Sequence, residues 1–113
     1  MTGTDAPDRG DLVWIDFDPQ AGHEQAGRRP ALVVSPGAYN ARVKLALLCP
    51  ITSRVKGYPF EVALPEGLLI SGVVLADQVR CVDWRARNCT FVQEAPASVV
   101  QEVLARVAPL LTP

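Results

Sequence analysis

Short apolar runs alternate along the chain with turn-forming residues, and this pattern predicts a protein built mainly of β-strands. The first run, Asp11 to Phe17, reads DLVWIDF and predicts a strand buried on much of both faces, ended by Asp18-Pro19. Six further runs have the length and composition of strands: 31–35, 45–51, 59–64, 72–75, 79–84 and about 90–92. Such spacing favours a small antiparallel barrel or sandwich of about six or seven strands.

The end of the chain has a helical period. Pro96 stands where it suits a first helical turn. Apolar residues then recur on one stripe: Val99, Val100, Val103, Leu104, Val107, Leu110 and Leu111. Because a helix of this length is marginal alone in water, we expect the stripe to pack on the sheet or on a second subunit. Pro109 is expected to bend or end the helix near Ala108. One short helical turn is also expected at 36–40.

Length and composition limit the class of protein. The 113 residues, 49% of them apolar, predict a single domain over 1–113 with a flexible N-terminus at 1–8. No signal peptide is recognisable, and no apolar run reaches the ~20 residues that cross a bilayer, so we expect a soluble cytoplasmic protein without membrane contact. Cys49, Cys81 and Cys89 contain no CxxC pair and are expected to be small buried apolar residues. We expect no metal and no cofactor.

The charge is unevenly distributed. The formal net charge is −1, yet five of the twelve acidic residues lie within the first 18 positions. From Pro19 onward, ten lysines and arginines stand against seven acidic residues, and the basic ones cluster at 28–29, 54–56 and 80–87. A local basic groove for nucleic acid is therefore compatible with the neutral total, and an ordinary solvated surface is the alternative.

Two polar segments carry the candidate chemistry. In GHEQAGRRPALVVS, Glu24, Arg28 and Arg29 are predicted to lie in a loop at the entrance of a strand that starts after Pro30. In CPITSRVKGYPFEV, hydroxyls and cations follow one predicted strand and precede the next: Thr52, Ser53, Arg54 and Lys56. Cations, hydroxyls and one carboxylate at neighbouring strand ends suit a phosphodiester, because the cations neutralise its oxygens and the carboxylate can move a proton.

Together with GDLVWIDFDP before them and GVVLADQVRCVDWRAR after them, these segments form a series that closely resembles the MazF/PemK family of bacterial toxins, its MazF members above all. The resemblance runs from about Pro7 to the C-terminal helix. It implies a compact SH3-like barrel with a C-terminal helix, and a homodimer. It further implies a metal-independent endoribonuclease that cuts single-stranded mRNA at a short motif, and neutralisation by a MazE-like antitoxin.

The resemblance places the family's catalytic pair at Arg29 in the RRP element and at Thr52 in the CPIT element. The reaction it implies is attack of a ribose 2′-hydroxyl on the adjacent phosphate, leaving a 2′,3′-cyclic phosphate and a 5′-hydroxyl. Because arginine is a poor base at neutral pH, we hypothesise that Glu24 takes the 2′ proton. For Glu24, a salt bridge to Arg28 or Arg29 and a contact to a base edge stay open as alternatives.

Further RNA contacts are expected from the same segments. Arg28, Arg54 and Lys56 suit phosphates, with Ser53 beside them. Sequence choice is expected to come from a second set: Asp16, Phe17, His23, Gln25, Asp77 and Gln78. A core position for Phe17 and a turn cap at Asp77-Gln78 are the alternatives. Trp14 and Trp84 are expected in the core or at a dimer interface.

The recognised site is expected to contain ACA, although PEGLLIS at 65–71, Arg42-Val43-Lys44 and His23 depart from the family pattern. The alternative function is a CcdB-like gyrase poison, which has the same fold and acts by binding alone. The paired RRP and CPIT elements favour the nuclease, because a binding module has no reason to hold both.

Overall fold

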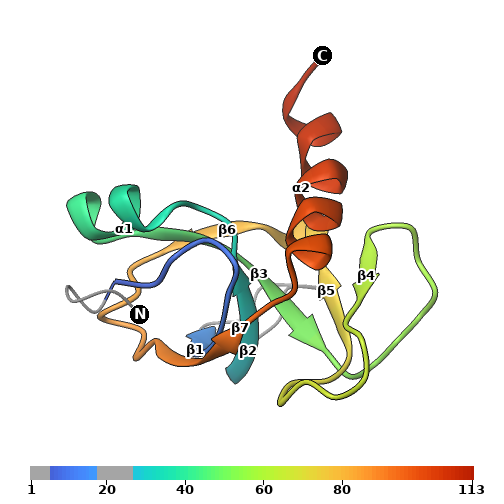
Figure 1. Ribbon diagram of the computed structural model, residues 1–113. Helices are drawn as coiled ribbons and strands as arrows, with labels where there is room; N and C mark the ends of the chain where they lie inside the picture. The colour runs from blue at the N-terminus through green and yellow to red at the C-terminus, as the bar shows by residue number, and fades with distance from the viewer. Residues whose placement is uncertain (1–5, 18–26) are drawn as a thin grey trace.

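The computed structural model describes residues 6–17 and 27–113, which form strands and two α-helices (Figure 1). The strands are β1 (Asp11–Phe17), β2 (Gly27–Val33), β3 (Ala46–Thr52), β4 (Glu61–Ala63), β5 (Val73–Leu75), β6 (Arg80–Val82) and β7 (Thr90–Glu94). The helices are α1 (Gly37–Val43) and α2 (Ala97–Leu111), with a 3₁₀ turn, η1 (Ala76–Gln78), between β5 and β6.

The seven strands form one antiparallel sheet in the order β4-β5-β3-β2-β1-β7, and β6 also pairs with β3. β3 is the central element, since its first residues pair with β6, its last residues pair with β5, and β2 runs along its other edge. The prediction of a small, mainly antiparallel β fold with a C-terminal helix is confirmed. Among the described strands the sheet stays open, because β4 and β7 are not paired with each other.

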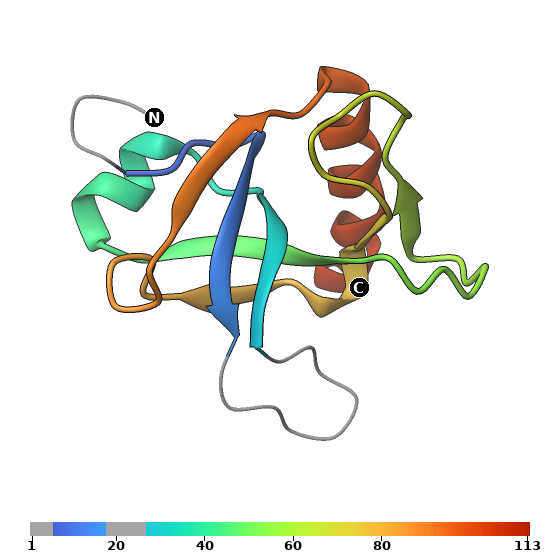
Figure 2. The ribbon, with the colours of Figure 1, turned by 90° about the horizontal axis from the view of Figure 1, so that it is seen from below.

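Each face of the sheet has its own apolar core. The core under α2 includes Leu12, Leu32, Ile51, Val99, Val103 and Val107. The core on the opposite face includes Val13, Ile15, Phe17, Ala31, Val33 and Trp84. β1 and β2 contribute to both cores because successive side chains of a strand point to opposite faces. Figures 1 and 2 show α1 and α2 at opposite ends of this assembly.

A buried polar residue fastens α1 to its surroundings. The side chain of Asn40 is fully buried; its Nδ2 donates to the carbonyls of Pro7 (2.8 Å) and Ser35 (3.0 Å), and its Oδ1 accepts from the Ser35 hydroxyl (2.6 Å). The indole N–H of Trp84 donates to the Asn40 carbonyl. One side chain and its backbone therefore join the N-terminal segment, the end of β2 and the chain after β6.

β2 begins earlier than predicted. It starts at Gly27, so Arg28 and Arg29 lie inside the strand and not in a loop before it. Proline restricts the residue before it to extended backbone, and this restriction suits continuation of the strand through Pro30, which lies opposite Trp14 of β1. β1 has its predicted range, and the remaining strands differ from theirs by one or two residues at their ends.

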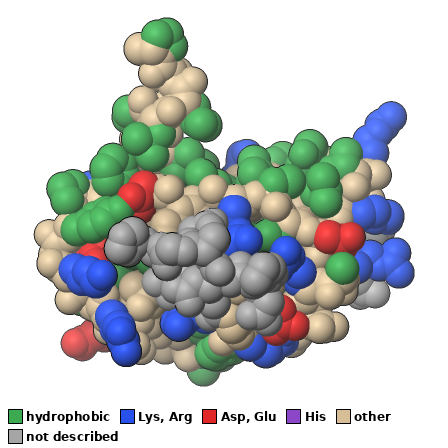
Figure 3. All heavy atoms as spheres, turned by 180° about the vertical axis from the view of Figure 1, so that it is seen from behind, with side chains coloured by type: hydrophobic (Ala, Val, Ile, Leu, Met, Phe, Trp, Pro, Cys, Tyr) green, Lys and Arg blue, Asp and Glu red, His purple; other side chains and the backbone are tan. Residues whose placement is uncertain are grey.

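The helices also extend further than predicted. α1 runs to Val43, and α2 continues through Pro109 to Leu111. Of the two effects expected of Pro109, an end of the helix near Ala108 is therefore wrong, and a bend stays a prediction. Proline removes one intrahelical hydrogen bond, and here only two helical residues follow it. Val99, Val103 and Val107 are buried as expected, whereas Leu110 and Leu111 are 49% and 75% exposed. Figure 3 shows this end of α2 projecting from the body of the molecule with apolar side chains at its tip. Glu102 and Arg106, one turn apart on α2, form an ion pair at 2.8 Å.

The predictions for the cysteines and the tryptophans hold in part, and the dimer-interface alternative for Trp14 stays a prediction. Cys49 is buried and Cys89 is half-buried, and burial raises the pKa of their thiols to about 12 and about 11. Cys81 is exposed, as is its cross-strand partner Leu47. Trp84 is a core residue, whereas Trp14 is 40% exposed and is not part of either core. Within the described ranges, no helix is long and apolar enough to cross a membrane.

Candidate active site

The register of β2 and β3 bears on the relation between Arg29 and Thr52. The two strands pair through Ala31 with Pro50, Leu32 with Cys49 and Val33 with Leu48. Arg29 and Thr52 each lie two residues beyond the first of these pairs, so the same register, if continued, would set them opposite each other on one face of the sheet. The pairing of β2 with β3 thus brings two segments 23 residues apart in sequence to the same end of the sheet.

Thr52 is held rigidly. Its side chain is 6% exposed, its hydroxyl oxygen accepts the Arg54 N–H at 3.1 Å, and it pairs with Val73 of β5. The adjoining Gly72 has a φ of +119°, and a Cβ there would lie 2.2 Å from the Thr52 carbonyl oxygen. Only glycine therefore permits the chain before β5 to pass so close to Thr52.

A groove of about 380 Å³ opens beside the two arginines. It is lined by Trp14, Arg28, Arg29, Pro30, Ile51, Ser53 and the segment 69–71. The exposed face of Trp14 gives this groove an aromatic wall, which suits stacking of an unpaired base. Sequence reasoning had assigned Trp14 to the core or to a dimer interface, since nothing in an apolar run tells which indole is left uncovered.

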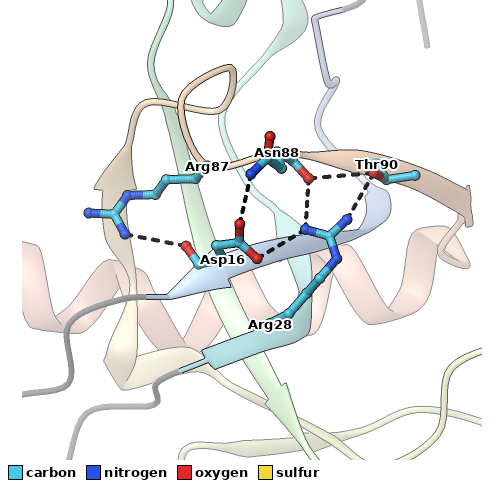
Figure 4. Close-up of polar contacts among 5 residues, drawn as sticks. All are labelled: Asp16, Arg28, Arg87, Asn88 and Thr90. Atoms are coloured by element: carbon cyan, nitrogen blue, oxygen red, sulfur yellow. Dashed lines mark hydrogen bonds and ion pairs between the residues drawn. The ribbon is translucent and has the colours of Figure 1, made fainter.

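Arg28 and Asp16 form a hydrogen-bonded network with the segment before β7 (Figure 4). Arg28 Nη1 lies 3.1 Å from Asp16 Oδ1 and 2.9 Å from the Asn88 carbonyl oxygen, while Nη2 donates to the Thr90 hydroxyl at 2.9 Å. The Asn88 amide donates to the other Asp16 oxygen at 2.9 Å. Arg87 Nη1 donates to the Asp16 carbonyl.

This network lowers the pKa of Asp16, through the Asn88 hydrogen bond first and the Arg28 hydrogen bond second. Since Asp16 pairs with Arg28 at the adjoining ends of β1 and β2, the two residues hold these strand ends together. Both were predicted to contact RNA. In the structure they are first of all partners of each other, and sequence analysis had no sign of Asn88 or Thr90.

The loop after Thr52 presents the other cations. Ser53, Arg54 and Lys56 are all exposed. The carboxylate of Glu61 accepts the N–H groups of Lys56 (3.0 Å), Gly57 (2.8 Å) and Tyr58 (3.3 Å), and Gly57 has a φ of +77°. Glu61 thus caps a tight turn whose left-handed position is filled by glycine. The sequence signal for this cap, a glycine followed four residues later by a carboxylate, was not recognised.

Besides Asp16, three of the residues predicted to read bases lie in the described part of the chain: Phe17, Asp77 and Gln78. Phe17 is fully buried, and Arg80 lies over its ring at 5.3 Å, so the alternative of a core position is correct and stacking on a base is wrong. Asp77 and Gln78 lie in η1, both half-buried, and Asp77 accepts a hydrogen bond from the Tyr58 hydroxyl. His23, Glu24 and Gln25 lie outside the described residues.

Basic side chains are spread over the described surface rather than confined to one patch. Figure 3 shows lysines and arginines in several groups with acidic and apolar side chains between them. Across 6–17 and 27–113, no three His, Cys, Asp or Glu side chains are grouped as metal ligands would be. The groove beside Trp14 is lined by two guanidinium side chains and the Ser53 hydroxyl, which are groups of the kind that bind a phosphate.

Comparison with known proteins gives concordant matches. The family described as "PemK-like, MazF-like toxin of type II toxin-antitoxin system" matches residues 8–111. The endoribonuclease toxin MazF of Escherichia coli (strain K12) is 46% identical over 111 residues, covering 98% of this chain and 99% of that protein. The crystal structure of MazF (form I) from Deinococcus radiodurans has a TM-score of 0.91 at 59% identity, covering 94% of this chain and 96% of that one. A MazE-MazF crystal structure (form II) from the same organism has a TM-score of 0.85 at 59% identity, with the same coverage.

Proposed function

The chain belongs to the family of PemK-like, MazF-like toxins of type II toxin-antitoxin systems, and from this premise we propose that it is an endoribonuclease toxin that cuts single-stranded mRNA. The observation that supports this most is the β2–β3 register, which, continued by two residues, would set Arg29 opposite Thr52. The likeness to the E. coli endoribonuclease over nearly the whole chain supports it independently.

The proposed reaction is an internal transfer at one phosphate. The ribose 2′-oxygen forms a bond to phosphorus, the bond from phosphorus to the 5′-oxygen breaks, and the products are a 2′,3′-cyclic phosphate and a 5′-hydroxyl. Arg29 binds the phosphate oxygens and stabilises the extra negative charge of the transition state. The hydroxyl of Thr52, fixed by its burial and by the Arg54 N–H, donates to the same oxygens. DNA lacks the attacking hydroxyl and is not cut.

The 2′ proton goes to Glu24 in this proposal, on sequence grounds alone, because a carboxylate is a better base than a guanidinium at neutral pH. The leaving 5′-oxygen takes up one proton. Glu24→Gln should then lower turnover and abolish the rise of rate with pH that a carboxylate base produces. Unchanged turnover of Glu24→Gln across the pH range would rule out this assignment.

Binding of the strand is divided between phosphate and base contacts. Arg54 and Lys56 hold neighbouring phosphates, with Ser53 beside the groove. Base choice comes from the groove next to Trp14 and from the segment that carries His23 and Gln25, and the cut site contains ACA. Since each phosphate contact releases a counterion, binding should weaken with salt by a slope near −0.7 per phosphate.

The proposal includes partners. A MazE-like antitoxin covers the RNA-binding surface with an acidic segment that orders on binding, and the toxin is a homodimer; the MazE-MazF crystal structures support the antitoxin. The exposed apolar end of α2 is available for subunit contact. Because its substrate is mRNA, the protein acts in the cytoplasm.

The test is cleavage of a long single-stranded RNA by the purified protein in EDTA, with both new ends mapped by sequencing. Wild-type protein should cut at one short motif and leave 5′-hydroxyl ends. Arg29→Ala and Thr52→Val should each lose about 10²- to 10³-fold in rate while staying folded, as removal of one preorganised donor typically does. Arg42→Ala, which removes an exposed cation on α1, should cut like wild type. No cutting by folded wild-type protein would instead favour the CcdB-like gyrase poison.

A further inference from the structure

The loop 53–60, which carries Arg54 and Lys56, is fastened to the body of the protein at its far end. It leaves the sheet at Thr52 and returns at Glu61, and both of these residues pair with β5. η1 follows β5 directly, so the 3₁₀ turn lies next to the point where the loop returns. The position of the two cations therefore depends on what holds the tip of the loop.

Besides the Glu61 cap described above, three contacts join that tip to η1 and α2. The Tyr58 hydroxyl donates to Asp77 Oδ2, the Ala76 N–H donates to the Phe60 carbonyl at 3.0 Å, and Arg106 of α2 donates to the Pro59 carbonyl. The contacts of Ala76 and Arg106 are made to backbone carbonyls of the loop. The contact between Tyr58 and Asp77 is made by two side chains, so a side-chain substitution removes it and keeps both backbone contacts.

Asp77 is placed to hold Tyr58 and is poorly placed to read a base. Its Oδ2 is engaged by the Tyr58 hydroxyl, and its Oδ1 is buried from solvent without a hydrogen-bond partner within the described structure. A base edge would reach this carboxylate only after Tyr58 had released it. The Tyr58 ring is fixed further by an edge-to-face contact with Phe60, at 6.1 Å between ring centroids.

We propose that Asp77 is a positioning residue for RNA binding, which acts through Tyr58 to hold the Arg54–Lys56 loop in its bound shape. This replaces its predicted role as a base-reading residue and rests on the proposed nuclease function. Because the loop already has this shape before RNA binds, it loses fewer conformations on binding. The Tyr58–Asp77 hydrogen bond therefore lowers KM and leaves the transition-state contacts of Arg29 and Thr52 unchanged.

The first experiment needs no RNA. Trypsin cleaves after Arg54 and Lys56, both exposed, and a loop must open locally to enter a protease. Tyr58→Phe removes only the hydroxyl, and we expect it to raise the cleavage rate at these two sites about fivefold, which is what one typical hydrogen bond contributes to an opening equilibrium. Asp77→Ala should do the same, and the double variant should be no faster than either single one. Tyr39→Phe, a half-exposed tyrosine on α1, is the matched control and should digest like wild type.

The second experiment measures cleavage kinetics and maps the cut sites. Tyr58→Phe and Asp77→Ala should each raise KM about fivefold with kcat within twofold of wild type and with the same motif. Asp77→Asn keeps an acceptor for the Tyr58 hydroxyl and should restore most of the affinity. A changed motif or a lower kcat in Asp77→Asn, with Tyr58→Phe unaffected, would mean that Asp77 contacts RNA directly. Unchanged tryptic cleavage in Tyr58→Phe would overturn the proposal even if the protein proved not to be a nuclease.

Discussion

Replacing Asn40 by alanine should destabilise the protein more than any exposed substitution, because this side chain is fully buried and makes three hydrogen bonds. The change leaves the Pro7 carbonyl, the Ser35 carbonyl and the Ser35 hydroxyl without the partner they have now. A buried group left unsatisfied costs about 1 to 3 kcal/mol. Water can enter the space of the missing amide, so the lower part of this range applies to each group. For the three groups together, the expected loss in the free energy of unfolding is about 3 to 5 kcal/mol.

Urea denaturation at one fixed protein concentration measures this loss, since association of subunits would otherwise shift the apparent stability. The expected fall in melting temperature is about 12 to 20 °C, at roughly 4 °C per kcal/mol for a domain of this size. Arg42→Ala, an exposed position two residues further along the same helix, should stay within about 0.5 kcal/mol of wild type. If Asn40→Ala lost less than about 1 kcal/mol, the buried bonds would not be what fastens α1, and this account of the fold would be refuted.

Two further predictions concern the site. Gly72→Ala should lower both stability and cleavage rate, since its Cβ would lie 2.2 Å from the Thr52 carbonyl oxygen. Gly67→Ala, also at positive φ but with open space around it, should lower stability alone. Equal cleavage rates of the two variants would contradict the close approach at Gly72. Asp16, whose pKa is lowered in the folded protein, contributes stability that is complete above its ordinary value of 3.8 and is lost as the pH falls through the folded value. The stability difference between wild type and Asp16→Asn should therefore shrink below about pH 4 in urea titrations, and a difference that is constant down to pH 2 would show that the network does not depend on the charge.

Much of the fold could be predicted from local pattern. The alternation in DLVWIDF gave the β1 range, and the spacing of the valines gave the apolar stripe of α2, which packs on the sheet, one of the two partners expected for it. The family resemblance carried by the four motifs is confirmed by the match over residues 8–111. The errors lie where local rules compete. The second strand was expected to start after Pro30, but it passes through Pro30, because pairing with β1 outweighs the loss of one N–H donor.

The candidate site was predictable only in part. Arg29 and Thr52 were named from their motifs, but their alignment depends on the register of two strands, and the register is set by the whole sheet. Phe17 was wrongly expected at a base, since a sequence pattern does not tell which aromatic residue the neighbouring elements will cover. Asn88, Thr90 and Glu61 were not predicted because their partners depend on the tertiary arrangement of loops.

By itself the sequence determined which segments are strands, which one is a long helix, and which residue types can bind a phosphate, because these depend on periodicity and on the chemistry of single side chains. The tertiary structure decided which of those side chains are free to act. It buried Phe17, left one face of Trp14 uncovered, and paired Arg28 with Asp16 and Tyr58 with Asp77. These outcomes depend on contacts between residues far apart in the chain, which form only when the strands and helices have packed together.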